Sequence, residues 1–354
     1  MSDMTITSSS GSYDIEIAVG AAARAVADGT VIVADRIFAD RWDVDPARLV
    51  VIEAAESEKT LSTCERVIVA MRELGLRRDG RVVAVGGGVV QDIATLASSL
   101  YMRGVRWTYV PTTLMAMADS CIGGKSSINA GGMKNLVGNF YPPSRIAVDP
   151  SFVASLTGDA LVSGLAEAVK ICFARGAVEF DAYITSSAAH APGPDPATAE
   201  LIDLVLRSKK WFVEIDEFDV AERRLLNFGH SFGHAWESAC DYAAPHGIAV
   251  AVGMMAAIRH PGSGSTEDTR RLDEYCRSIL RSSVPTLDAA RSRTDWGSFT
   301  AALRSDKKNS AGVLRLVLPS VDGRLELREF ADDDHSLDVA EAAIRLALED
   351  ALNA

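Results

Sequence analysis

Three histidines have a spacing that suits a catalytic metal site. Residues 227–234 read NFGHSFGH, so His230 and His234 stand four positions apart. On a helix, both side chains would project from one face. His246 follows sixteen residues after His230, directly before the apolar stretch GIAVAVGMMAAI. Two imidazoles and one carboxylate form a common catalytic zinc site, which leaves one coordination position open for water or substrate.

The candidate carboxylate is Glu167, in the segment GLAEAVK at residues 164–170, with Lys170 one helical turn later. A glutamate and a lysine are costly to bury on an apolar helix unless they pair or serve a site. A single buried histidine is usually a hydrogen-bonded core residue. Here three of the six histidines fall within seventeen residues, among glycines. The spacing favours a metal site but leaves open whether His230 or His234 is the ligand.

A glycine turn, Gly86, Gly87 and Gly88, lies between the apolar stretch RVVAV and a helix-like segment. Glycines let the backbone approach a pyrophosphate, and the N-terminus of the following helix attracts its charge. The spacing is not the usual GxGxxG fingerprint, so a tight packing turn is an equal alternative. A place at the carboxyl end of a sheet strand favours a ligand site. Asp35 directly follows another predicted strand and could bind a ribose, although alone it is more typical of a helix cap or a solvated turn residue.

Several cationic residues could bind an anionic substrate. Residues 119–125 read DSCIGGK, and Lys134-Asn135 follow shortly after. Glycines, serines and lysines together suit a phosphate or a carboxylate. The GGK is not a P-loop, because it lacks the GxxxxGK[ST] spacing. Other candidates, each of which could equally be a solvated surface cation, are Arg103, Lys209, Arg223, Lys307 and Lys308.

The composition is that of an ordinary acidic enzyme. The 354 residues, 48% apolar and 24% charged, suggest two domains, or one large one, and are enough for a sizeable core. A net charge of -12 argues against nucleic-acid or membrane-surface partners, because no basic excess exists to neutralise phosphates. Five scattered cysteines without a CxxC pair predict reduced thiols in a cytoplasmic protein. No signal-peptide pattern occurs, and no apolar run reaches the roughly 18 residues of a membrane span.

The elements that would position these residues alternate between strand and helix in the first half of the chain. Predicted strands lie at 13–19, 29–34, 49–53, 81–85 and 107–110. With helices at 60–76 and 91–101, this rhythm predicts an α/β fold with a doubly wound, mostly parallel sheet. Beyond about residue 150 the helical pattern dominates, apart from a strand pair at 314–318 and 325–330. We expect a disordered tail at 1–12, a dinucleotide-binding α/β domain at 13–150, and a mainly α-helical domain for metal and substrate at 151–354.

Taken together, these motifs resemble the dehydroquinate synthase family of sugar-phosphate cyclases over residues 13–330. The matching stretches are GGGVVQD (86–92), YMRGVRWTYVPTTLMAMADSCIGGK (101–125), KNLVGNFYPP (134–143), GLAEAVK (164–170), RRLLNFGHSFGHAWE (223–237) and HGIAVAVGM (246–254). Only the joint match is specific. The family fold, an N-terminal dinucleotide-binding α/β domain and a helical C-terminal domain, agrees with the pattern. Family members are typically homodimers.

The resemblance implies NAD and Zn²⁺ (or Co²⁺) as cofactors. The implied metal ligands are Glu167, His230 and His246. The implied catalytic residues are Lys125, Lys170, His234, Asn227 and Asp119. The implied substrate-binding residues are Lys209 and Arg223, with Arg103 (its own or the partner subunit's), Asn135 and Lys307 or Lys308 near the phosphate. The implied NAD-binding residues are Asp35, Glu56, Lys59, Gly86, Gly87, Gly88, Asp92, Thr112 and Thr113.

The implied reaction converts 3-deoxy-D-arabino-heptulosonate 7-phosphate to 3-dehydroquinate and phosphate. A transient oxidation to a ketone acidifies the neighbouring C–H, so that phosphate can be eliminated. Reduction and an intramolecular aldol closure follow, and the metal lowers the pKa of a substrate hydroxyl. Because NAD is recycled, the enzyme would be a lyase, placed in the shikimate pathway of aromatic amino acid biosynthesis.

The cations and the departures from the family pattern bear on the substrate. Arg223 and Lys209 match positions that bind a carboxylate, which favours the keto acid phosphate over sedoheptulose 7-phosphate or glucose 6-phosphate. However, Ile248 replaces the usual Glu, Gln91 the usual Gly, and residues 131–135 read GGMKN instead of PLGKN. These changes leave open a related cyclase of a specialised cyclitol pathway. Two further hypotheses are a metal-dependent polyol dehydrogenase, which would produce net NADH, and an inactive binding protein, against which the complete ligand set speaks.

Overall fold

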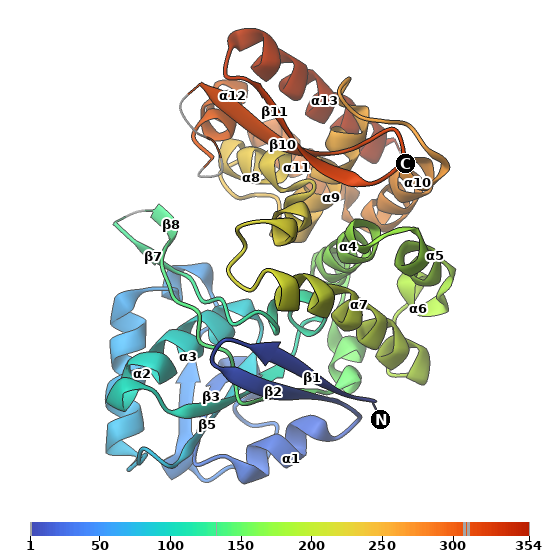
Figure 1. Cartoon of the computed structure of the whole chain (residues 1–354). Coiled ribbons are helices and arrows are strands. Elements are labelled where there is room, and N and C mark those ends of the chain that lie inside the picture. The colour runs from blue at the N-terminus through green and yellow to red at the C-terminus, as the bar shows by residue number, and fades with distance from the viewer. Residues whose placement is uncertain (1, 132, 307–308, 310–311, 354) are drawn as a thin grey trace. The chain divides into compact units, whose positions relative to one another are not determined.

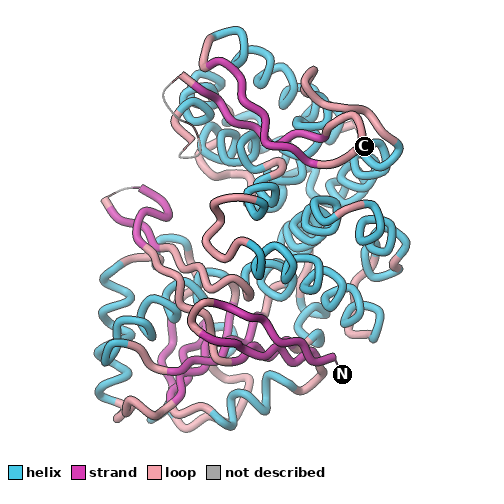
Figure 2. The backbone as a smooth tube through the Cα atoms, in the orientation of Figure 1, coloured by secondary structure: helices cyan, strands magenta, loops and turns pink. Residues whose placement is uncertain are grey.

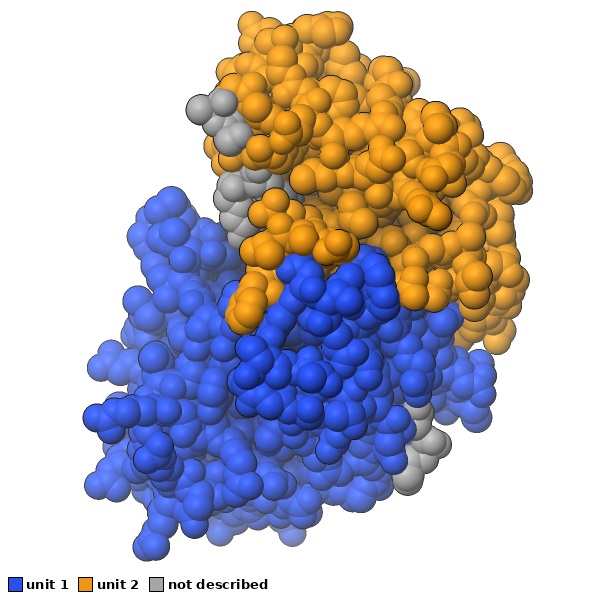
Figure 3. Space-filling view, viewed as in Figure 1, with its two compact units in different colours: residues 1–155, 192–217 blue, residues 156–191, 218–354 orange. Residues whose placement is uncertain are grey.

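The computed structural model describes residues 2–131, 133–306, 309 and 312–353. The chain divides into two compact units, which Figure 3 colours separately. Unit 1 contains residues 1–155 and 192–217, and unit 2 contains residues 156–191 and 218–354. The expected boundary near residue 150 is therefore too simple, since residues 192–217 return to the first unit. Among the described residues, no helix combines the length and the apolar character needed to cross a bilayer.

Seven strands of unit 1 form one sheet in the order β1-β2-β9-β6-β5-β3-β4. Their bounds are β1 (Ser2–Ser8), β2 (Gly11–Ile17), β3 (Val31–Asp35), β4 (Leu49–Ile52), β5 (Arg81–Gly86), β6 (Arg106–Pro111) and β9 (Arg145–Val148). All neighbouring strands pair in parallel except β1 and β2. All of β3 is buried, as expected for a strand covered on both faces. The prediction of a mostly parallel, doubly wound α/β sheet is confirmed (Figure 1).

Helices and a small hairpin complete unit 1. The helices are α1 (Ala21–Asp28), α2 (Leu61–Glu73), α3 (Gly88–Leu100) and α7 (Pro196–Ile215). The hairpin strands are β7 (Ile128–Ala130) and β8 (Met133–Val137). Short 3₁₀ turns are η1 (Arg36–Phe38), η2 (Pro46–Arg48), η3 (Glu56–Glu58), η4 (Tyr101–Arg103) and η6 (Pro150–Ser155). The segment η5 (Ala116–Ser120) is a π-helix, an uncommon geometry that is often found at functional sites.

The prediction of a disordered tail at residues 1–12 is wrong. Strand β1 pairs with β2 in continuous antiparallel register from Ser2–Ile17 to Ser8–Gly11. The serine-rich segment is the turn of this hairpin, while the alternate residues Met4 and Ile6 are buried. Helix α7 contacts β1 through Lys210, whose Nζ donates a hydrogen bond to the Thr5 carbonyl at 2.6 Å. The alternating apolar residues of this segment are too few to predict a strand from the sequence, yet the segment forms one in the sheet.

Unit 2 is mainly helical, as predicted, and Figure 2 shows one strand pair in it. Its helices are α4 (Gly158–Arg175), α5 (Ala177–Thr185), α6 (Ser187–His190), α8 (His230–Ala239), α9 (His246–Arg259), α10 (Glu267–Leu280), α11 (Val284–Arg293), α12 (Trp296–Arg304) and α13 (Asp334–Leu352). The 3₁₀ turns are η7 (Glu222–Asn227) and η8 (Arg281–Ser283). The strands are β10 (Val313–Pro319) and β11 (Leu325–Ala331), which pair antiparallel.

Close contacts at glycines position helices α4, α8 and α9 against one another. A Cβ on Gly253 of α9 would lie 2.0 Å from the carbonyl oxygen of Gly229, next to the start of α8. A Cβ on Gly247 would lie 2.3 Å from Ser163 Cα of α4. Real Cβ atoms do not approach that closely, so only glycine fits at these two contacts. The backbones of three helices therefore meet where the histidines and Glu167 are located.

Candidate active site

Helices α4, α8 and α9 bring the predicted metal ligands together within unit 2. His230 is the first residue of α8, His246 is the first residue of α9, and Glu167 lies in the middle of α4. Glu167 Oε1 lies 3.6 Å from His230 Nε2 and 3.4 Å from His246 Nε2. One nitrogen each of His230, His234 and His246 lies within 4.8 Å of the other two. All four side chains thus converge.

The buried carboxylate of Glu167 shows that these residues fit a divalent metal. Its side chain is only 1% exposed, and Lys170 Nζ contacts Oε2. The other oxygen, Oε1, is buried and accepts no hydrogen bond from the described residues. A buried carboxylate oxygen without a hydrogen bond is costly, and a cation facing it, either a metal ion or the protonated ring of His246, would reduce that cost. Carboxylate oxygen and imidazole nitrogen are both normal Zn²⁺ ligands.

The two histidines that approach Glu167 are His230 and His246, while His234 is the exposed member of the cluster. The ring of His234 stacks on that of His246, with centroids 5.4 Å apart. This arrangement is compatible with the ligand set that the family resemblance implies. The nitrogen distances alone still allow His234 as a ligand.

Glu237 is a residue that the sequence patterns did not single out. Its Oε2 lies 3.2 Å from His246 Nδ1, and its side chain is 13% exposed. It follows His230 by seven positions and His234 by three, so helical spacing alone places it on the same face of α8. Ile248, where the family usually has Glu, is fully buried in α9. The carboxylate that supports His246 in this chain is therefore that of Glu237.

The charges around Glu167 affect the pKa of two groups. Burial alone would raise the pKa of Glu167, but Lys170 and His246 outweigh burial and hold it well below its usual range. Burial alone would lower the pKa of His246, but the neighbouring carboxylates of Glu167 and Glu237 raise it to about 10. In the metal-free protein at neutral pH, Glu167 is ionised and His246 carries a proton that a metal would displace.

Three further predicted residues lie in unit 2. Lys170 is 2% exposed and pairs with Glu167, one turn earlier on α4. Arg223 is 4% exposed on η7. Asn227 ends η7, separated by two residues from the start of α8, and its Nδ2 donates to the Arg224 carbonyl at 3.0 Å. Lys307 and Lys308, predicted near the phosphate, lie outside the described residues.

The glycine turn of unit 1 fits an anion. Strand β5 ends at Gly86, and α3 begins at Gly88 without a side-chain cap, so its first N–H groups remain available. Thr112 N donates to the Gly86 carbonyl at 3.1 Å. A Cβ on Gly87 would lie 3.1 Å from Thr113 Cγ2, whereas one on Gly88 would meet open space. The predicted glycines and threonines thus lie together at the carboxyl ends of the neighbouring strands β5 and β6.

Other predicted cofactor residues of unit 1 cluster around Lys59. Its Nζ lies 2.9 Å from Asp92 Oδ2 and 3.8 Å from Glu56 Oε1, and donates to Asn135 Oδ1 at 3.1 Å. Asn135 has a positive φ of 55°. The family resemblance assigned Asn135 to the phosphate, and the structure places it beside the residues assigned to NAD. Asp35 accepts from Ile37 N at 3.3 Å, so it also acts as the cap of η1.

Lys209 on α7 is bound to the π-helix region. It is 5% exposed, and its Nζ lies 2.5 Å from Asp119 Oδ1. The same ammonium donates to the carbonyls of Asp119 and, at 3.4 Å, Ile122. An ammonium has three N–H donors, and these three acceptors match that number. The Lys209 ammonium is therefore held by groups of the π-helix region.

The remaining predicted cations of unit 1 are Lys125 and Arg103. Lys125 Nζ lies 5.9 Å from the ring centroid of Phe140. Arg103 is exposed at the end of η4 and has a φ of 64°, directly after Met102 with a φ of 48°. Two consecutive non-glycine residues in the left-handed region indicate local strain, which is common at functional sites.

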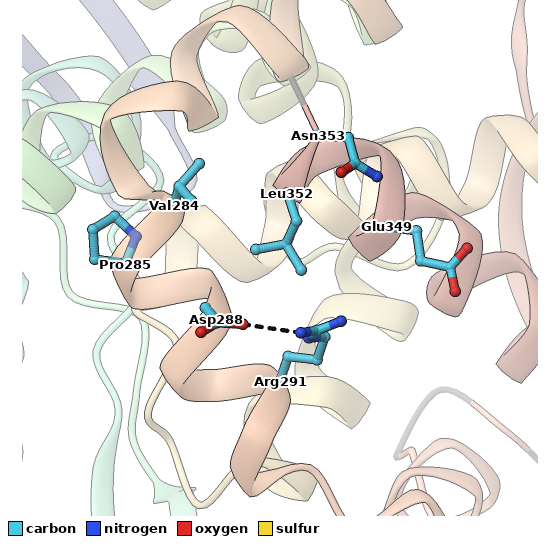
Figure 4. A pocket seen from close by; sticks show the side chains of 7 residues that line it. All are labelled: Val284, Pro285, Asp288, Arg291, Glu349, Leu352 and Asn353. Carbon is cyan, nitrogen blue, oxygen red and sulfur yellow. Dashed lines mark hydrogen bonds and ion pairs between the residues drawn. The ribbon is translucent and has the colours of Figure 1, made fainter.

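A separate pocket lies between α11 and the end of α13 (Figure 4). It is lined by Val284, Pro285, Asp288, Arg291, Glu349, Leu352 and Asn353. Asp288 and Arg291 are paired at 3.0 Å. The lining contains none of the predicted site residues, so this pocket is not the candidate active site.

Comparison with known proteins identifies relatives of the sequence. A family model described as 3-dehydroquinate synthase N-terminal matches residues 49–163, and one described as 3-dehydroquinate synthase C-terminal matches residues 164–309. The 3-dehydroquinate synthase of Xanthomonas axonopodis pv. citri (strain 306) is 39% identical over 286 residues, which cover 78% of this chain and 76% of that protein. That of Halorhodospira halophila (strain DSM 244 / SL1) is 36% identical over 322 residues, covering 87% and 88%.

Solved structures share the fold over nearly the whole chain. A 2-epi-5-epi-valiolone synthase from Streptomyces hygroscopicus subsp. jinggangensis 5008, with NAD+ and Zn2+ bound, has a TM-score of 0.79 at 28% identity, covering 95% of this chain and 97% of that one. A 2-deoxy-scyllo-inosose synthase, complexed with carbaglucose-6-phosphate, NAD+ and Co2+, has the same TM-score of 0.79 at 21% identity, covering 98% and 99%. A probable glycerol dehydrogenase from Sinorhizobium meliloti 1021 is less similar, with a TM-score of 0.62 at 17% identity, covering 95% and 96%.

Proposed function

This chain belongs to the 3-dehydroquinate synthase family, and on that premise we propose that it is a phosphate-eliminating cyclase that converts 3-deoxy-D-arabino-heptulosonate 7-phosphate to 3-dehydroquinate. In reaction class it would be a carbon–oxygen lyase. The observation that carries the proposal is the buried Glu167 Oε1, which accepts no hydrogen bond from the described residues and faces His230 and His246. A metal at this point is what a hydroxyl-activating cyclase requires.

Each cofactor has a set of residues that fits it. Glu167, His230 and His246 would hold Zn²⁺ or Co²⁺, which supplies Lewis acidity toward a substrate hydroxyl. The glycine turn and the uncapped N-terminus of α3 would bind the pyrophosphate of NAD, which supplies reversible oxidation at one carbon. The bound NAD+ and metal ions of the solved relatives support both assignments.

The remaining groups of unit 2 orient the substrate and handle protons. Lys170 keeps the Glu167 carboxylate ionised and fixes one of its oxygens. Arg223 provides a planar guanidinium suited to bidentate binding of a carboxylate. His234, the exposed member of the cluster, is placed to accept or release a proton at a ring nitrogen near the reacting hydroxyl.

The cellular setting is part of the same proposal. We propose a cytoplasmic homodimer with a small phosphorylated substrate and no nucleic-acid or membrane partner. Family resemblance supports the homodimer. All five cysteines are buried thiols outside any disulfide, which fits a reducing compartment.

Phosphate release tests the proposed function directly. The purified protein would be supplied with NAD+ and Zn²⁺, and phosphate and NADH would be measured together. We expect phosphate release from the heptulosonate phosphate with no net NADH, and at least about tenfold less from sedoheptulose 7-phosphate, since only the first carries a carboxylate for Arg223. A preference for sedoheptulose 7-phosphate would replace the substrate assignment. Net NADH from a polyol would replace the reaction class.

A further inference from the structure

The side chain of Gln91 joins the glycine turn to the π-helix within unit 1. Gln91 lies in the first turn of α3 and is only 3% exposed. Its Nε2 donates to the Ser120 carbonyl at 2.6 Å, and its Oε1 accepts from Ser120 Oγ at 2.5 Å. One residue therefore uses both ends of the buried amide, which fixes the orientation of the amide plane.

The position of Ser120 gives this contact its importance. Ser120 is the last residue of the π-helix η5, where helical carbonyls lack a partner of their own. Gln91 provides the donor that satisfies that carbonyl. The preceding residue, Asp119, carries the carboxylate that lies 2.5 Å from Lys209 Nζ. The orientation of Asp119 thus depends on a turn that is held from outside by a glutamine side chain.

We propose that Gln91 is a positioning residue for substrate binding, because it holds η5 in the conformation that directs Asp119 toward Lys209. The inference rests on the proposed function and on the family resemblance, which implies that Asp119 is a residue of the active site. Without the amide, the half-buried Ser120 carbonyl and hydroxyl would lose the hydrogen bonds that Gln91 makes with them, at a cost that a small rotation of the turn relieves. Such a rotation moves the adjacent Asp119, and misplacing a substrate-positioning group weakens the binding of the substrate.

A volume-conserving substitution removes the hydrogen bonds alone. Gln91→Met keeps the size and helix propensity of the side chain. We expect a KM for the heptulosonate phosphate at least about tenfold higher, with kcat changed less than about threefold and NAD+ affinity changed less than about twofold. The matched control is Thr95→Val on the same helix, which removes a buried hydroxyl that has no hydrogen-bond partner among the described residues. It should leave KM unchanged.

A second variant tests whether the effect passes through Ser120. Ser120→Ala removes the hydroxyl but keeps the carbonyl, so it should raise KM less than Gln91→Met does. The double variant should be no worse than Gln91→Met alone, because the hydrogen bond that Ser120→Ala removes is already lost in Gln91→Met. Fully additive effects would contradict transmission through Ser120.

Hydrogen exchange separates this inference from the proposed function. In Gln91→Met, amide exchange should rise at least about tenfold in residues 116–122 and stay unchanged in the peptides of β3 and β5. Unchanged exchange in 116–122 overturns the inference, whether or not the enzyme is active. A wild-type protein that releases no phosphate would refute the proposed function instead. Faster exchange with an unchanged KM would overturn the role in substrate binding and leave Gln91 a purely structural brace.

Discussion

Substitutions at Glu237 should weaken metal binding in a graded way. The Glu237 carboxylate contacts His246 Nδ1 at 3.2 Å, which leaves Nε2 directed toward Glu167. Removing such a supporting carboxylate typically costs about 10–100-fold in metal affinity, equivalent to about 1.4–2.7 kcal/mol. Glu237→Gln keeps an oxygen that can accept from Nδ1 and loses only the charge, so we expect about tenfold. Glu237→Met loses both, so we expect about 100-fold.

The assay is competition for Zn²⁺ between the metal-free protein and a chelator at constant pH. Glu274→Gln, which changes an exposed glutamate on α10 that pairs only with Arg270 among the described residues, is the matched control and should bind as the wild type does. Thermal unfolding of the metal-free variants would show that the fold is retained. The reasoning would be refuted if Glu237→Met bound Zn²⁺ within about twofold of wild type, since the Nδ1 contact would then be irrelevant to the ligand.

Three further predictions concern the same unit. His246→Ala should lose Zn²⁺ on gel filtration and remain folded. Glu167→Ala should lose Zn²⁺ too, and also about 3–5 kcal/mol of stability, because buried Lys170 loses its partner. Stoichiometric zinc in either variant would contradict the ligand assignment. Arg223→Ala should raise the KM for the keto acid phosphate at least about tenfold, with Arg223→Lys intermediate; an unchanged KM would remove the carboxylate argument. The pKa of His246 is raised to about 10, so its charged form stabilises the metal-free protein fully below about pH 6.5, and this contribution is lost as the pH rises through 10. Apparent Zn²⁺ affinity should therefore increase with pH across that window, by up to about tenfold per unit, and a flat profile would show that no proton is displaced.

The parts of the fold that the sequence predicted have strong periodic patterns. Strand β5 and helices α4 and α9 are long or apolar enough to be recognised alone. Strand β1 was not recognised, because its apolar residues Met4 and Ile6 stand among serines and threonines. The helix that contacts it also lies about 200 residues later in the chain. The short strand β9 and the β7–β8 hairpin carry too few residues for a periodic signal.

The site shows the same division between local and long-range information. Spacing within the chain was enough to suggest His230, His246 and the glycine turn. The pairing of Lys209 with Asp119 joins residues 90 positions apart, so no local pattern could indicate it. Glu237 was recognisable in principle, because it shares a helix face with His230. The structure was needed to show that it contacts His246.

The return of α7 to unit 1 has a consequence for how the chain is made. Residue 8 leaves the ribosome roughly 200 residues before α7 is complete, and at about 5–20 residues per second this delay is about 10–40 s. During that time the β1–β2 hairpin lacks the contact that Lys210 provides. A gene fragment ending at residue 155 would encode every strand of the seven-stranded sheet and still omit helix α7 of the same unit. We expect such a fragment to need a grafted residue 192–217 segment before it folds as a stable, independent domain.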